Sequence, residues 1–329
     1  MGQYYKIVNA DQRQFMHPHH MGAGLKAIEI VTSWSVPAAL VGLIAVDPNN
    51  QPADLANNKD TGRWAGDRIL LIGDYAENTD LPGWDGPPLS ELYGLCDNSE
   101  EPTLEGLMKI YEPDTARSIY PKELERWRER SAAGAYTEVT PLGLVEQGAS
   151  VRFNVKDEGW RTFIPVCALA TRTGDDRCVF EPVEKDNPEM MAYYKRCGIT
   201  EEVWGRAPLD GSWHAITDGE EGLGQTRVLA NLDRREFIDP AAFGETPTTA
   251  GIMRGGSWGS ASALAMLLIY NQRRGGGDLR PNPLVGTWQG HHLIASSERS
   301  GRFPSTDEIK ASFTNISDAA FQMLAKERD

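Results

Sequence analysis

Three histidines near the N-terminus are the residues whose spacing first suggests chemistry. His17 and His19 are two positions apart in the segment MHPHHMG, so in an extended strand both side chains project from the same face. Paired imidazoles of this kind bind zinc or iron, and Asp74 offers a carboxylate to complete the set. The sequence therefore allows a divalent metal site at His17, His19 and Asp74, and with it a metal-dependent hydrolase. The alternative is a strand that ends at Pro18, with the imidazoles at the surface or hydrogen-bonded to the backbone.

The segment GGSWG, residues 255–259, has the G-x-S-x-G pattern of the nucleophile elbow in α/β-hydrolases. Such an enzyme also needs an acid and then a histidine later in the chain. Asp278 and His291 follow in that order, but too soon to leave room for the strands and helices between them. A second pair, Ser33-Trp34, lacks the glycines, and a serine ahead of a helix can accept hydrogen bonds from the free amides of the first turn. Ser257 is therefore interpreted as a helix-capping residue, and no catalytic residue is assigned.

Two loops have the composition of binding sites rather than of catalytic sites. The run Gly275, Gly276, Gly277 and Asp278 could present backbone amides to a small anion or a nucleotide. No Gly-Lys-Ser or Gly-Lys-Thr follows it, which excludes a P-loop. Trp84 lies in the stiff loop PGWDGPP, where an exposed aromatic ring is a candidate contact for a partner protein. The alternative for Trp84 is packing as a lid over its own lobe.

The two ends of the chain repeat one another. VNADQRQFMHPHHMG at residues 8–22 matches ANLDRREFIDPAAFG at residues 230–244 with a constant shift of 222 positions, and further along the shift becomes 224. GRWAG at residues 62–66 then matches GTWQG at residues 286–290. One register held over this length predicts an internal duplication that forms two similar lobes. What the lobes have in common is expected to serve the fold, and only their differences to serve function.

The pattern of each lobe predicts an α+β fold. Two β-rich runs around an Asn-x-Asp turn, a short apolar helix, a buried strand and an amphipathic helix give the order ββαβα. The lobes are expected at residues 1–112 and 223–329. Between them, residues 113–222 have no match and are predicted to form an inserted, partly β middle region that also contains a charged helix at PKELERWRER.

The chain resembles an uncharacterised family of small bacterial and phage proteins in three segments: MGQYYKIVNADQRQFMHPHHMG, GRWAGDRILLIGDYAE and GGGDLRPNPLVGTWQG. Members of that family look like a single lobe that opens with MGQYY and carries a His-Pro-His segment, a Gly-Gly-Gly-Asp run and a WAGDRI…GDY strand. In this chain the first lobe has His-Pro-His and GDY, and the second has Gly-Gly-Gly-Asp. The resemblance implies the single-lobe architecture at both ends of the chain and implies no activity.

Charge and composition exclude several classes of function. The net charge of −14 repels nucleic-acid phosphates and anionic lipid head groups. The longest apolar run, residues 36–46, is too short to cross a bilayer, and the N-terminus lacks the pattern of an export signal. Four cysteines without a C-x-x-C pair are then expected to be reduced thiols in a cytoplasmic protein.

The expected function is a non-catalytic binding or self-assembling scaffold, whose partner is another protein or a second copy of the chain. No cofactor, nucleic acid or membrane is expected to take part. The alternatives are the metal-dependent hydrolase at His17 and His19 and a small-anion or nucleotide binder at residues 275–278.

Overall fold

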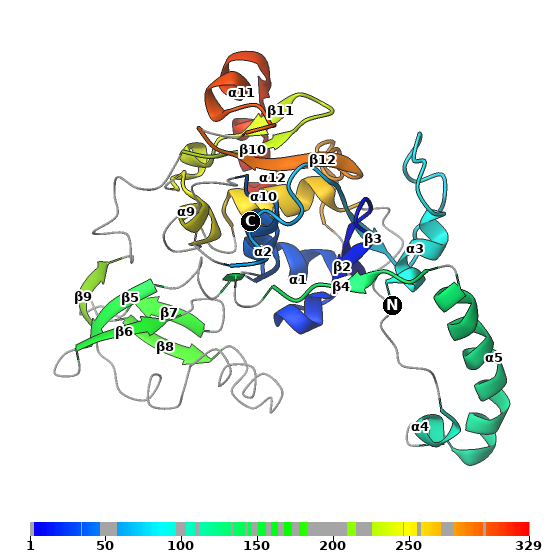
Figure 1. Cartoon of the computed structure of the whole chain (residues 1–329). Helices are drawn as coiled ribbons and strands as arrows, with labels where there is room; N and C mark the ends of the chain where they lie inside the picture. Colours follow the sequence, from blue (N-terminus) through cyan, green and yellow to red (C-terminus); the bar gives the residue numbers. More distant parts are fainter. Residues whose placement is uncertain are drawn as a thin grey trace.

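The computed structural model describes residues 3–33, 35–46, 58–96, 103–108, 112–132, 134–141, 144–145, 151–155, 159–163, 168–172, 178–182, 209–214, 226–245, 247–254, 258–270, 279–298 and 301–328. These residues form an α+β protein built on one eight-stranded mixed sheet, with two smaller sheets beside it (Figure 1). The α+β class predicted from the sequence is confirmed.

The main sheet has the strand order β13-β11-β10-β12-β3-β1-β2-β4. Its strands are β1 (Tyr5–Asn9), β2 (Gln14–Met16), β3 (Arg68–Gly73), β4 (Thr137–Glu138), β10 (Val228–Asn231), β11 (Glu236–Ile238), β12 (His291–Ser296) and β13 (Thr314–Asn315). Neighbouring strands are antiparallel except at the two edges, where β4 pairs with β2 and β13 pairs with β11 in parallel. The order β13-β11-β10-β12 from one edge therefore corresponds strand for strand to the order β4-β2-β1-β3 from the other edge, with the same parallel and antiparallel pairings.

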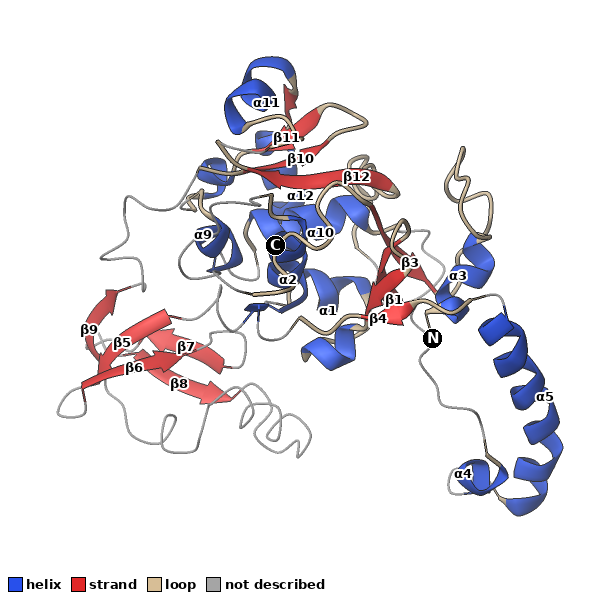
Figure 2. Cartoon of the chain, in the orientation of Figure 1, coloured by secondary structure: helices blue, strands red, loops and turns tan. Residues whose placement is uncertain are grey.

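Helices cover both faces of this sheet, whereas α4 (Leu104–Met108) and α5 (Pro113–Ala132) project away from it (Figure 2). The other helices are η1 (Pro18–Met21), α1 (Ala27–Val31), α2 (Ser35–Ile44), α3 (Leu89–Leu95), η4 (Pro240–Phe243), α9 (Thr249–Arg254), α10 (Ser260–Leu268), α11 (Thr306–Ser312) and α12 (Ser317–Arg328). Side chains alternate between the two faces of each strand. Ile7 and Leu71 therefore face α2 and α10 in the main core, whereas Val8 and Leu70 pack under α3 on the opposite face. In the C-terminal half, α11 covers the equivalent face through Ile309.

The helices α2 and α10 form the centre of the main core because their sequences are apolar on every side. All ten residues of α2 and all nine of α10 are buried. A helix without a polar face is stable only when other elements surround it, and each large apolar side chain buried there contributes about 1.5–3 kcal/mol. Neither helix is long, and no helix in the described part of the chain is long and apolar enough to cross a membrane.

The β1–β2 and β10–β11 hairpins have the same register. Their residue pairs correspond one for one at the shift of 222 positions found in the sequence. The turn residues Arg13 and Arg235 both have a positive φ, 54° and 53°. Each hairpin leads into a short 3-10 helix that begins at a proline and ends at a glycine, Gly22 or Gly244, with a φ of 74°. The repeated sequence thus gives repeated local structure.

The halves meet where β3 and β12 pair, and the contacts across this seam are reciprocal. The backbone contacts occur in pairs related by a shift of 224 positions: Ala45–Ala295 with Leu71–Ile269, and Gly66–Leu293 with Ile69–Gly290. In the second set, the glycine N–H donates to the carbonyl oxygen of the other half, over 2.7 Å from Gly66 and 2.8 Å from Gly290. Each half therefore completes backbone hydrogen bonds of the other.

The predicted middle region contributes to the main sheet. Its residues Thr137–Glu138 form the edge strand β4, which pairs with β2 as β13 pairs with β11. The predicted charged helix is α5, which begins at Pro113 and continues through Pro121. Five further strands form the two small sheets, β6-β5-β9 and β7-β8: β5 (Val151–Val155), β6 (Gly159–Phe163), β7 (Ala168–Arg172), β8 (Cys178–Pro182) and β9 (Leu209–His214).

The sequence predicts that an amphipathic helix closes each lobe, at residues 104–111 in the first and 316–324 in the second. In the structure these two helices do not occupy equivalent places. Helix α12 follows the edge strand β13 and packs against α10, where Ala320 and Leu324 are buried. Helix α4, its expected counterpart, precedes α5 and packs with it. A short apolar periodicity indicates a helical face but does not specify which strand the helix follows.

Candidate functional site

The structure brings the three histidines together but does not bring Asp74 to them. His17 follows β2, and its ring centroid lies 4.7 Å from that of His20 and 5.7 Å from that of His19. Asp74 follows β3, on the other side of β1, where its carboxylate accepts a hydrogen bond of 3.0 Å from the backbone N–H of Tyr4. Within the described residues, no group of three histidine, cysteine or acidic side chains is arranged to hold a metal ion. The metal site at His17, His19 and Asp74 therefore remains a prediction.

The imidazole of His17 is held in its neutral form. Burial, followed by the neighbouring rings and charges of His20 and Lys6, lowers the pKa of His17 to about 4. Its Nδ1 atom is buried and has no hydrogen-bond partner among the described residues. His20 stacks on it and contacts the carboxylate of Glu138 on β4. This arrangement fits an imidazole that packs η1 against the edge of the sheet.

Three other predicted positions lie outside the described residues or have a packing role. Ser257 and the run from Gly275 to Asp278 are outside the described part, so their capping and anion-binding roles stay predictions. Trp84 is half-buried, and its indole N–H donates to the carbonyl oxygen of Pro87 over 2.8 Å. The guanidinium of Arg68 lies 5.1 Å from the ring centroid of Trp84. Packing accounts for this ring, and its role as a partner contact also stays a prediction.

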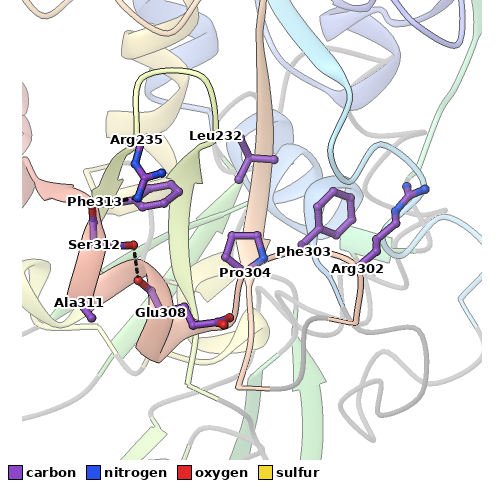
Figure 3. Close-up of a pocket in the computed structure, with 9 residues that line it drawn as sticks. All are labelled: Leu232, Arg235, Arg302, Phe303, Pro304, Glu308, Ala311, Ser312 and Phe313. Atoms are coloured by element: carbon purple, nitrogen blue, oxygen red, sulfur yellow. Dashed lines mark hydrogen bonds between the residues drawn. The ribbon is translucent and has the colours of Figure 1, made fainter.

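A pocket opens between the β10–β11 turn and α11, in a region that the sequence did not single out (Figure 3). Its volume is about 690 Å³. It is lined by Leu232, Arg235, Arg302, Phe303, Pro304, Glu308, Ala311, Ser312 and Phe313. Figure 3 shows Leu232, Phe303 and Pro304 in its centre, with Arg235 and Arg302 at opposite ends. The pocket therefore has an apolar middle and a cation at either side.

Each of these two arginines stacks on a phenylalanine. The guanidinium carbon of Arg235 lies 4.9 Å from the ring centroid of Phe313, and that of Arg302 lies 4.7 Å from the ring centroid of Phe303. Arg235 also donates a long hydrogen bond of 3.4 Å to the carbonyl oxygen of Ser312. Among the described residues, neither guanidinium has a carboxylate within ion-pair distance. Cation–π stacking orients both groups without neutralising them.

The nearest acidic side chain in the lining is already engaged. The Oε2 atom of Glu308 accepts hydrogen bonds from the backbone N–H and the hydroxyl of Ser305, over 2.7 and 2.9 Å. These bonds lower the pKa of Glu308. The pair forms a capping box at the start of α11, which satisfies free amides of the first turn. The carboxylate of Glu308 thus stays ionised at the helix terminus, and the lining carries two cations and one anion.

Similarity to other proteins does not explain the pocket. Comparisons with protein-family models, curated proteins and solved structures gave no match. The resemblance to the bacterial and phage family accordingly rests on the three segments that carry it, and the function has to be argued from the geometry.

The equivalent position in the N-terminal half has a similar pair of an arginine and an aromatic ring. Arg13 is the counterpart of Arg235 and lies over Tyr136, with its guanidinium carbon 5.5 Å from the ring centroid. Its Nη2 donates a hydrogen bond to the carbonyl oxygen of Gly134. The two halves therefore share an arginine stacked on an aromatic ring, and they differ in what surrounds it. The difference is the kind of feature that the repeat leads us to associate with function.

A second difference between the halves is the cap of the buried helix. At the start of α10 the carboxylate of Glu245 accepts hydrogen bonds from the hydroxyl and the backbone N–H of Ser260, the latter over 3.0 Å. At the equivalent place in the first half, the hydroxyl of Ser33 accepts a hydrogen bond of 3.3 Å from the backbone N–H of Val36. Burial raises the pKa of Glu245 to about 7, although both bonds from Ser260 oppose this. A cap explains this carboxylate, so it is not assigned to chemistry.

Sequence reasoning missed the pocket for identifiable reasons. Arg235 matches Arg13, so the repeat assigns it to the shared fold, whereas Arg302 and Phe303 belong to no motif that predicts a site. The capping box at Ser305 and Glu308 was the one local signal that could have located α11. It would have predicted a helix beside Phe303, but not the approach of the β10–β11 turn to that helix.

Proposed function

We propose that the chain is a non-catalytic binding protein whose ligand site is the pocket beside α11. The observation that carries this proposal is the pair of arginines at the ends of the pocket, Arg235 and Arg302, each stacked on a phenylalanine and without a carboxylate partner among the described residues. Both arginine side chains are exposed, so a bound anion would replace water at their edges with charge-assisted hydrogen bonds. The apolar centre adds surface that a ligand can bury.

The alternative of a metal-dependent hydrolase has less support. The rings of His17 and His19 are tilted by 55° with their centroids 5.7 Å apart, but within the described residues no third histidine, cysteine or acidic side chain joins them in an arrangement that could hold a metal ion. The carboxylate expected to complete the site, Asp74, is bonded to Tyr4 instead. The repeat leads to the same preference, because the backbone contacts common to both halves account for the fold, whereas the aromatic partners of Arg13 and Arg235 differ, Tyr136 in one half and Phe313 in the other.

Turnover assays test this proposal against an enzymatic one. Generic carboxylic and phosphoric esters are offered to the wild-type protein with and without added zinc, and to the variants His17→Ala and Ser257→Ala. We expect no turnover above the level of buffer in any sample. Turnover by the wild type that disappears in either variant would overturn the proposal, and loss in His17→Ala alone would favour the hydrolase.

A further inference from the structure

The apolar part of the pocket sets the size and character of a ligand. Leu232, Phe303 and Phe313 belong both to the lining and to the small core between the sheet and α11, so these side chains are supported from behind. The pocket has a volume of about 690 Å³ and is widely open to solvent, so a bound ligand would keep one side exposed. A ring placed among these side chains would bury apolar surface on a floor that is already formed.

The two guanidinium groups set the charge of the ligand. Each turns its flat face to a phenylalanine ring, so that its N–H groups remain at the edge, where they can donate to an oxyanion. An arginine forms paired hydrogen bonds with a carboxylate or a phosphate, and such bonds are stronger than those between neutral groups. The position of Arg235 and Arg302 on opposite sides of the apolar centre (Figure 3) allows an anionic group to bind at either end.

The surrounding charges limit the anion to a small one. Next to the pocket, Arg234 forms an ion pair of 2.9 Å with Glu236, so its charge is already compensated. The protein as a whole carries a net charge of −14. At physiological ionic strength, charges are screened over about 8 Å, so a compact ligand experiences the two local arginines, whereas an extended polyanion also meets the acidic surface.

We propose that the pocket binds a small molecule in which a carboxylate or phosphate group is attached to an aromatic or other apolar ring. This inference rests on the proposed function and adds the chemical class of the ligand. The ring occupies the floor formed by Leu232, Phe303 and Pro304, and the anionic group accepts hydrogen bonds from Arg235 or Arg302. A ligand that lacks the ring or the charge makes half of these interactions.

Titration calorimetry with four probes tests each part of the inference. Phenyl phosphate and benzoate have both ring and charge, inorganic phosphate has the charge alone, and phenol has the ring alone. We expect the first two probes to bind, and the last two to bind at least about tenfold more weakly. Comparison of phenyl phosphate with benzoate shows which oxyanion the site prefers. Raising the salt concentration should weaken the binding of both.

Matched variants locate the site. The double variant Arg235→Gln/Arg302→Gln should weaken the binding of phenyl phosphate by about tenfold or more, because it removes the charged donor at both ends, and the single variants show which end holds the anion. Arg13→Gln removes the counterpart of Arg235 in the other half and should leave the affinity within about twofold. Ala311→Trp places a large ring in the lining and should abolish binding. A melting temperature close to that of the wild type shows that each variant folds.

The inference is overturned if phenol binds as tightly as phenyl phosphate, if Arg13→Gln weakens binding as much as the double variant, or if neither anionic probe binds. These outcomes leave the non-catalytic part of the proposed function standing, because the turnover assays decide separately between a binding protein and an enzyme. Ester turnover that disappears in His17→Ala, together with normal binding of phenyl phosphate, would overturn the non-catalytic function and leave the proposed class of ligand standing.

Discussion

Arg68 lies directly opposite His292 where β3 and β12 pair, and each of these residues is the counterpart of the other under the shift of 224 positions. Arg68 bonds to Asp11 through its Nε atom over 2.8 Å, and His292 contacts Asp233 through Nδ1 over 2.9 Å. The two aspartates are themselves counterparts, at the turns of the two hairpins. The seam between the halves therefore passes through a position that faces its own equivalent, and the same backbone pattern there carries different side chains.

The glycines that follow the buried helices should be needed equally in both halves. Gly62 has a φ of 69°, and a Cβ atom on it would lie 2.5 Å from the carbonyl oxygen of Ala45. Gly286 has a φ of 77°, and its Cβ would lie 2.8 Å from the carbonyl oxygen of Ile269. Gly62→Ala and Gly286→Ala should each lower the free energy of unfolding by about 2–4 kcal/mol, because a backbone atom must move.

Gly83 provides the control for these two substitutions. Its φ is 83°, but nothing lies within 4 Å of a Cβ placed on it. Gly83→Ala should cost only about 1 kcal/mol, the penalty of the positive φ alone. Urea denaturation measures all three variants. Equal losses in all three would show that close backbone approach at the seam does not matter.

The buried tryptophans give a second comparison between the halves. The indole N–H of Trp64 donates to the side-chain oxygen of Gln14 over 2.8 Å, and that of Trp288 donates to the carboxylate of Glu236 over 2.7 Å. Both rings are fully buried. Trp64→Phe and Trp288→Phe should each destabilise the protein by about 2–4 kcal/mol, with the larger loss for Trp288→Phe because its acceptor is charged.

Denaturation curves of the two tryptophan variants decide this prediction. The mutation Glu236→Gln in both the wild-type and the Trp288→Phe backgrounds completes a double-mutant cycle that isolates the contribution of the charge, because in the wild-type background the amide oxygen can still accept from the indole N–H. A loss of less than about 0.5 kcal/mol in either single variant would contradict the shared role of the two rings.

Much of the fold could be predicted because its determinants are local. The Asn-x-Asp turns predicted both hairpins, and the continuous apolar runs at residues 35–44 and 260–268 predicted the two buried helices. The constant shift predicted equal registers, and the strand pairs have them. The edge strand at Thr137–Glu138 could not be predicted, because two residues contain no periodicity and their place is fixed by pairing with β2.

The pocket and the buried titratable groups depend on contacts between segments that are distant in the sequence. Arg302 and Phe303 reach the β10–β11 turn only after the intervening strands and helix have packed. The lowered pKa of His17 depends in part on Lys6, which the neighbouring strand β1 places beside it. Residue types predicted chemistry at His17, whereas the tertiary structure gives it the environment of a packed, neutral imidazole.

Glu245 should make the stability fall as the pH rises. Its pKa is raised from the usual value to about 7 in the folded protein, so between about pH 4.5 and pH 7 the folded state binds more protons than the unfolded state. The free energy of unfolding should therefore decrease across this interval by roughly 2 kcal/mol from this group. Glu245→Gln, which keeps a neutral acceptor at the cap, should remove that decrease in denaturation curves recorded across the interval. An unchanged pH dependence in Glu245→Gln would contradict the buried cap.

His17 should have the opposite effect in an overlapping interval. Its pKa is lowered to about 4 in the folded protein, so between about pH 6.5 and pH 4 the unfolded state binds more protons and stability falls as the pH falls. After allowance for solvent screening of a half-buried group, the loss amounts to roughly 1–2 kcal/mol. His17→Asn should remove it, as measured by thermal unfolding at several pH values. A wild-type protein that loses stability when zinc is removed, with no such loss in His17→Asn, would instead indicate a metal site.

The most direct test of the account is a nuclear magnetic resonance titration with phenyl phosphate, recorded on the backbone amides. The account predicts saturable shifts at Arg235, Ser312 and Phe313, with no comparable shifts at their counterparts Arg13 and Tyr136. Shifts of equal size around both arginines, or no shift around Arg235 at concentrations that saturate calorimetry, would contradict a ligand site in the pocket beside α11.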